Sequence, residues 1–102
     1  MNAIGQMIRS KRIANGQLLR HIAAYLDIDQ SILSKIEHGE RKPTKENIIK
    51  LAEILKINTD ELMIQYISDK IMSEFEHEPC LPKAIKYLEK EVSLKHLKQE
   101  IQ

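Results

Sequence analysis

The chain has 102 residues, which suits one compact domain with a short extension and is too short for two ordinary domains. Glycine, proline and aromatic residues are scarce, so we expect an all-α fold with an aliphatic core. The single cysteine, Cys80, excludes an internal disulfide. The sequence contains no run of about 18 apolar residues, so it predicts no membrane-spanning helix. The first residues lack the apolar region of a signal peptide, so we expect a cytoplasmic protein without a membrane partner.

The net charge of +1 hides an asymmetry between two parts of the chain. Residues 1–58 hold ten Lys and Arg against six Asp and Glu, a net charge of +4, and include all four arginines. Residues 59–102 hold six against nine, a net charge of −3. A positive segment favours contact with phosphates, whereas an acidic segment without arginine does not. Modest asymmetry is common in charged domains, so this observation supports a nucleic-acid partner without establishing one.

Periodic apolar residues and end signals predict three helices in the first part of the chain. The first runs over residues 3–14 and stops at Asn15-Gly16, because glycine readily ends a helix. The second begins near Leu18 or Leu19. The third follows Asp29, whose side chain can cap its free amides, and it ends at residues 38–39.

Three further helices are predicted after a loop at residues 40–43. Thr44 can cap the fourth helix. The fifth begins at residue 58 or 59 and has too many apolar residues for one stripe, so we expect one side to contact the core and another a partner chain. Prolines 79 and 82 break the chain before a sixth helix over residues 83–92. Its expected inward residues are Ala84, Ile85, Leu88 and Val92, and Leu94, Leu97 and Ile101 can prolong it.

Residues 19–38 carry two apolar helix faces separated by a short break. The small Ala23 allows two helices to approach closely, and Asp27 stands where the turn requires a left-handed backbone, which Asp tolerates better than most residues. This pattern predicts a helix-turn-helix, whose second helix enters the major groove of DNA. An ordinary helical hairpin with no DNA role is the alternative. The inward positions are Ile22, Leu26, Ile28, Leu33 and Ile36.

The chain resembles the lambdoid repressor and Cro type of helix-turn-helix, the XRE family, over residues 3–63. The likeness rests on residues 4–12, Gly16, Ile22-Ala23, residues 34–43 and residues 48–55. It implies a five-helix repressor-like domain in residues 1–63 that binds double-stranded operator DNA as a homodimer. Residues 64–102 then form a C-terminal helical extension for dimerisation or partner binding. The tail is similar to that of regulators encoded beside restriction-modification methyltransferases.

The outward side of the third helix holds the candidate base contacts. Glutamine can bond to two adenine atoms, lysine can donate to guanine, and serine can serve either base. Ile32, near the edge, can touch a thymine methyl group. Each of these residues is equally explained as part of a solvated helix surface. The base-contact set is Gln30, Ser31, Ser34 and Lys35, and family members place contacts at the positions matching the first two and the last.

The candidate phosphate contacts are basic residues around that helix. The family usually has a polar cap and a glutamine at the start of the second helix, and here these places hold Leu18 and Leu19. That phosphate contact is therefore expected to be lost or to be made by a neighbour such as Arg20. The basic residues after the third helix have a solvated loop as their alternative explanation. The phosphate-contact set is Arg20, His38, Arg41, Lys42 and Lys45.

The family resemblance also implies a structural ion pair. In the family, an arginine near the end of the first helix pairs with a glutamate that ends the third helix. Arg12 and Glu37 occupy the matching positions here. We expect a partly buried pair that holds the recognition helix in place and has no catalytic role.

The apolar fifth helix is the candidate dimer interface. Its residues for that role are Met63, Tyr66, Ile67, Ile71 and Phe75. The alternative is that the sixth helix covers them and closes the core. A second hypothesis for the whole chain is an antitoxin-like module whose C-terminal helices bind a partner protein.

Enzymatic motifs are missing from the sequence. His77 and Cys80 lack a second pair of ligands at a metal-binding spacing, and no nucleophile has a recognisable base. No glycine-rich phosphate loop is present. We therefore expect no catalytic residues, no metal and no cofactor.

Overall fold

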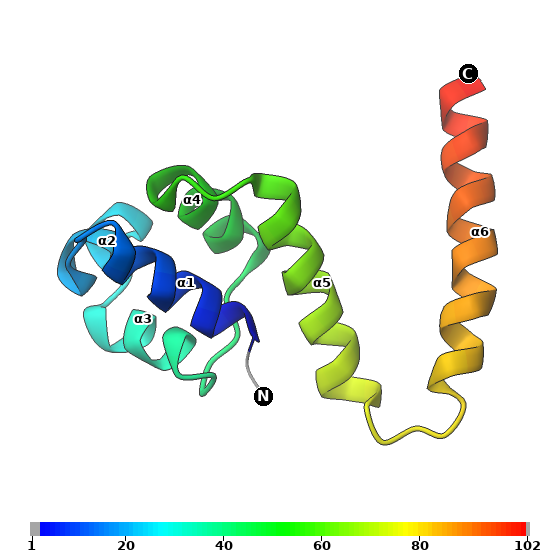
Figure 1. Ribbon diagram of the computed structural model, residues 1–102, viewed down its shortest axis with the longest axis horizontal. Helices are drawn as coiled ribbons and strands as arrows, with labels where there is room; N and C mark the ends of the chain where they lie inside the picture. Colours follow the sequence, from blue (N-terminus) through cyan, green and yellow to red (C-terminus); the bar gives the residue numbers. More distant parts are fainter. Residues whose placement is uncertain (1–2, 102) are drawn as a thin grey trace. The chain divides into compact units, whose positions relative to one another are not determined.

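The structure, a computed structural model, describes the backbone of residues 3–101 and the side chains of residues 3–97. The expectations for the first two residues and for the side chain of Ile101 lie outside this part. Every regular element within it is a helix, as predicted. The helices are α1 (Ala3–Ala14), α2 (Leu19–Leu26), α3 (Gln30–Glu37), α4 (Lys45–Leu55), α5 (Thr59–Phe75) and α6 (Leu81–Ile101) (Figure 1).

The chain divides into two compact units between Lys70 and Ile71. This division falls inside α5, which is one continuous helix from Thr59 to Phe75, so the first part of α5 belongs to the unit that contains α1 to α4. The functional boundary after residue 63, where the family resemblance fades, stays a prediction.

The core of the first unit is aliphatic and draws on α1 to α5. The second helix contacts both α3 and α4, and α1 contacts the same two helices (Figure 1). Full burial of one large aliphatic side chain stabilises a fold by about 1.5–3 kcal/mol, so this cluster is the main source of stability. The fully buried members are Ile8, Ile22, Leu33, Ile36, Ile48, Leu51, Leu55 and Leu62.

Four helices are followed by a residue with a left-handed backbone: Gly16, Asp27, Gly39 and Lys56. After α2, for example, the amide of Ile28 donates to the carbonyl oxygen of Ala23 at 3.1 Å, which closes the last turn. The left-handed conformation expected of Asp27 is confirmed, with φ at 57°. The sequence did not mark Lys56, because lysine is not typical of this conformation.

Replacing Lys56 with glycine is expected to raise the free energy of unfolding by about 0.5–1 kcal/mol, because glycine adopts a positive φ without steric cost. Lys56 has φ at 58° and an exposed side chain. Urea denaturation measures the change. The matched control is Lys56→Ala, which removes the same charge and keeps the backbone strain. Equal midpoints for the two variants would contradict the prediction.

The expected helix caps are present at one helix and absent at another. Thr44 and Asn47 form a reciprocal capping box, in which the amide of each donates to the side chain of the other at 3.0–3.1 Å. Asp29 has the extended backbone of a capping residue, but its side chain forms no cap. The expectation for Asp29 is therefore wrong, since its exposed carboxylate does not turn back to the helix amides.

The N-terminus of α1 is capped from a distant part of the chain. One carboxylate oxygen of Asp69, on α5, accepts the backbone amide of Ile4 at 3.0 Å. Its other oxygen accepts the side-chain amide of Gln65 at 2.8 Å. A negative charge stabilises a helix N-terminus, so Asp69 both satisfies a free amide and complements the dipole of α1.

The second unit contains the end of α5 and the whole described length of α6. The sixth helix begins at Leu81, two residues earlier than predicted, because proline is tolerated in a first turn. It continues past Val92 as one helix. The four residues expected to face inward are exposed, so that expectation is wrong: the buried core takes its members from α1 to α5. No helix in the described range is long and apolar enough to cross a membrane.

Candidate nucleic-acid interface

The second and third helices form a compact helix-turn-helix. The turn consists of left-handed Asp27, half-buried Ile28 and extended Asp29, after which α3 begins. Ala23 is buried on α2, which packs against both α3 and α4, as its small size predicts. The inward residues of both helices join the core, so the core holds α3 by one side only.

The two sides of α3 differ sharply. Leu33, Ile36 and Glu37 are buried, whereas Gln30, Ser31 and Lys35 are exposed. Three of the four candidate base contacts therefore lie on the outward side. Ser34, the fourth, is half-buried at its edge, and Ile32 packs partly against the core.

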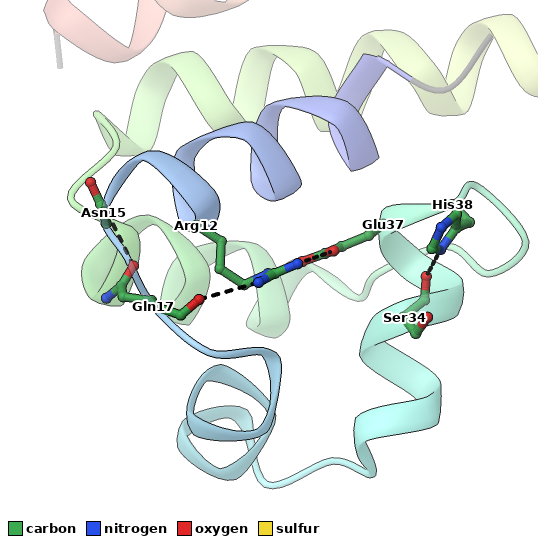
Figure 2. A network of polar contacts seen from close by, with 6 residues as sticks. All are labelled: Arg12, Asn15, Gln17, Ser34, Glu37 and His38. Atoms are coloured by element: carbon green, nitrogen blue, oxygen red, sulfur yellow. Dashed lines mark hydrogen bonds and ion pairs between the residues drawn. The ribbon is translucent and has the colours of Figure 1, made fainter.

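A bidentate ion pair joins α1 to the end of α3. Arg12 donates from Nε to Oε2 of Glu37 at 2.7 Å and from Nη2 to Oε1 at 3.0 Å (Figure 2). The side chain of Glu37 is 2% exposed and that of Arg12 is 14% exposed. The hydrogen bond with Glu37 raises the pKa of Arg12, against the lowering effect of burial, and the charge of Glu37 raises it further. Arg12 therefore stays charged at every pH at which the protein is folded.

The same arginine also supports the start of α2. Its Nη1 donates to the backbone carbonyl of Gln17 at 3.2 Å, just before α2 begins (Figure 2). The side chain of Gln17 donates to the carbonyl oxygen of Ile54, and Asn15 donates to that of Leu55, both at 3.0 Å. These carbonyls lie at the end of α4, where a helix lacks internal partners. Arg12, Asn15 and Gln17 thus connect α1, α2, α3 and α4.

The sequence marked Asn15 only as the end of the first helix and did not single out Gln17. Both lie beside Gly16 in what looked like an ordinary polar turn. The partner of Asn15 is 40 residues away in the chain, and that of Gln17 is 37 residues away. Only the fold brings them together, so no local pattern predicts these contacts.

The candidate phosphate contacts lie on three segments around α3. Arg20 is exposed on α2, Lys45 is exposed at the start of α4, and His38, Arg41 and Lys42 are exposed between α3 and α4. The amides of residues 40 and 41 both donate to the carbonyl oxygen of Lys35, at 2.9 and 3.3 Å. This turn is therefore held against the last turn of α3.

The start of α2 departs from the family pattern as expected. Leu18 occupies the capping position with an extended backbone and no side-chain cap, and it is exposed. Leu19 packs against the core instead. A polar side chain is therefore missing at both positions where the family usually contacts a phosphate.

The five candidate interface residues of α5 do not all lie on the same side of the helix. Met63 and Tyr66 are half-buried and pack against the core, and the ring of Tyr66 lies under the amine of Lys70, 5.1 Å away. Ile67 and Phe75 are exposed, and Ile71 is half-buried. Ile64, which the sequence did not select, is also exposed, so the exposed apolar residues of α5 are Ile64, Ile67, Met72 and Phe75.

Among the residues that the structure describes, no group of three or more His, Cys, Asp or Glu side chains can hold a metal ion. His77 lies 3.2 Å from Glu76, and Cys80 is an exposed free thiol.

A short turn between two packed helices, a second helix with a bare polar side, and a bidentate pair behind it define a helix-turn-helix domain of the repressor and Cro type. The chain belongs to the HTH_3 helix-turn-helix family, whose model matches residues 3–62. The resemblance to the XRE family is thereby confirmed.

Three curated relatives each match about two thirds of the chain or slightly less. The HTH-type transcriptional regulator RghRB of Bacillus subtilis is 38% identical over 64 residues, which are 62% of this chain and 46% of the relative. The transcriptional repressor RstR of cryptic phage CTXphi in Vibrio cholerae is 31% identical over 67 residues, 66% of this chain and 60% of the relative. The type II methyltransferase M.Sau96I of Staphylococcus aureus is 32% identical over 60 residues, 59% of this chain and 14% of that enzyme.

These alignments cover only part of each relative. The chain spans about half the length of the two regulators and a small fraction of the methyltransferase. No solved structure matches the chain.

Proposed function

We propose that the protein is a sequence-specific DNA-binding transcriptional regulator that inserts α3 into the major groove. The observation that carries this proposal is the division of α3, whose buried side is held by the core while Gln30, Ser31 and Lys35 project outward. The major groove of B-DNA admits an α-helix and presents a distinct pattern of donors and acceptors at each base pair. An adaptor with no DNA role would not require this bare polar side.

The exposed side chains suit two kinds of DNA contact. Gln30 has the donor and acceptor needed for adenine, and Lys35 can donate to guanine, with Ser31 beside them. Ser34 is half-buried and has a lesser role at the edge. The phosphate contacts fall to exposed basic residues on α2, on the turn after α3 and on α4: Arg20, His38, Arg41, Lys42 and Lys45.

The regulator acts as a homodimer on a pseudo-palindromic operator. Two recognition helices then lie about 34 Å apart, one turn of DNA. Support comes from α5, where Ile64, Ile67 and Phe75 are exposed. Apolar residues at helical spacing in solvent commonly mark an interface. The Vibrio relative is named a repressor, and we extend that mode to this chain: the bound dimer blocks access of RNA polymerase.

Replacing Ile67 with aspartate is expected to weaken self-association at least about tenfold, because a charge would be placed in the apolar interface. Sedimentation velocity across a concentration series measures the change. The matched control is Ile49→Asp on α4: Ile49 is 47% exposed and Ile67 is 51% exposed. If both variants sediment like the unaltered protein, α5 is not the dimer interface.

Selection of bound duplexes from random DNA tests the proposed function directly. We expect enrichment of a two-fold symmetric sequence, since each subunit of a dimer reads one half-site. Affinity should also fall steeply as salt rises, because each neutralised phosphate releases counterions. Binding without enrichment would contradict sequence-specific regulation.

A second candidate function is favoured by the exposed apolar residues of α6. Ile85, Leu88 and Val92 lie at spacings of three and four residues and are about half exposed. This arrangement suits an antitoxin-like protein whose C-terminal helices bind a partner protein while the first unit binds DNA. Binding of duplex DNA without enrichment of any sequence, together with a monomer in sedimentation, would favour this function over the first.

A further inference from the structure

The imidazole ring of His38 is held at the end of α3 by a defined hydrogen bond. Its Nδ1 lies 2.7 Å from the backbone carbonyl oxygen of Ser34 (Figure 2). The same oxygen accepts the backbone amide of His38 at 3.0 Å. A carbonyl oxygen only accepts hydrogen bonds, so Nδ1 must carry the proton.

This bond determines what the rest of the ring can do. In the neutral ring only one nitrogen carries a proton, so Nε2 is an acceptor. A phosphate oxygen is also an acceptor, and two acceptors form no hydrogen bond. Protonation adds a hydrogen at Nε2 and leaves the bond to Ser34 unchanged, because both forms donate from Nδ1. The charged ring then offers phosphate a charge-assisted donor.

His38 therefore differs from the other candidate phosphate contacts. Arginine and lysine side chains are charged donors throughout the physiological range, whereas imidazole changes its charge between about pH 5 and 8. The ring of His38 forms no ion pair with a carboxylate within the described residues. The buried carboxylate of Glu37 is already held by Arg12. The charged groups on its helix turn and the following loop are Lys35, Glu37, Glu40, Arg41 and Lys42. The two helices packed against α3 carry Arg9, Lys11 and Arg12 on α1, and Arg20 and a second imidazole, His21, on α2.

We propose that His38 is a phosphate contact that works only when its ring is protonated, so that the affinity for duplex DNA rises as the pH falls. This inference rests on the proposed DNA-binding function. Its ligand is a phosphodiester of the DNA backbone, and the contact is therefore independent of base sequence.

The test measures the affinity for a random-sequence duplex at about pH 5.5 and about pH 8, with ionic strength held constant. Lowering the pH from about 8 to about 5.5 is expected to tighten DNA binding by the unaltered protein about fivefold more than it tightens DNA binding by His38→Gln. His38→Lys, which is charged at both values, is expected to bind tightly at both. His96→Gln on α6 is the matched control and should keep the full pH response.

Salt dependence gives a second measurement of the same contact. Because one more phosphate is neutralised, the slope of log affinity against log salt should steepen by about one at the lower pH. His38→Gln should show no such change. If His38→Gln keeps the pH response and the slope change, the inference about His38 is wrong while DNA binding stands.

The tautomer can be tested without DNA. Nitrogen chemical shifts of the His38 ring in the free protein should show a proton on Nδ1 near neutral pH. A proton on Nε2 instead would overturn the inference and leave the proposed function untouched. If the unaltered protein binds no duplex at either pH, both the inference and the proposed function are wrong.

Discussion

Replacing Arg12 with methionine is expected to lower the free energy of unfolding by about 3–5 kcal/mol. The loss arises because the carboxylate of Glu37, 2% exposed, would remain buried without the guanidinium group that neutralises its charge. Small domains are typically stable by about 5–15 kcal/mol, so the variant would be close to unfolding. Thermal and urea denaturation, followed by circular dichroism, measure the change.

The paired control removes both charges. Arg12→Met combined with Glu37→Met is expected to recover most of the lost stability, because apolar replacement of a whole buried ion pair is often close to neutral. DNA affinity should fall in the single variant, since Arg12 also supports the carbonyl of Gln17 before α2. If Arg12→Met changes neither the melting temperature nor DNA binding, the pair does not hold the recognition helix.

Replacing Gln30 with alanine is expected to cost about 1–3 kcal/mol of discrimination at one base pair. Gln30 is the first residue of α3 and is exposed, and the N-terminal residues of a recognition helix contact base edges. Its truncation leaves the core contacts of α3 unchanged, so stability should move little. Competition binding with the selected duplex and with single-base variants measures the discrimination.

A phosphate-contact variant separates base reading from general affinity. Arg41→Ala is expected to weaken binding to all duplexes about equally and to reduce the salt slope by about one. Gln30→Ala should instead relax preference at one position. Equal losses on the selected duplex and on random DNA for Gln30→Ala would contradict its assignment as a base contact.

Much of the helix-turn-helix was predictable because its signals are local. Four of its five inward residues and the small Ala23 are buried, and the fifth, Ile28 in the turn, is half-buried. Burial at three- and four-residue spacing follows from helix geometry, and a left-handed turn residue follows from a short list of side chains. The pairing of Arg12 with Glu37, in contrast, came from the family resemblance, and the structure supplies its bidentate geometry.

Other features were not predictable because they join distant residues. Asp69 caps α1 across 65 residues of chain, and Gln17 reaches the end of α4 across 37. Lys56 takes a left-handed backbone that its residue type does not favour. Amphipathic spacing on α6 predicted inward residues, yet spacing shows only which residues share a side of a helix and not whether another element covers it.

The sequence by itself determined the six helices, the inward residues of the helix-turn-helix and the outward candidates on α3, because periodicity and turn chemistry act over a few residues. Tertiary structure decided which side of α5 packs against the core and how Arg12 and Gln17 connect four helices. These depend on distances and donor directions between groups that only packing brings together, and a one-dimensional pattern does not contain them.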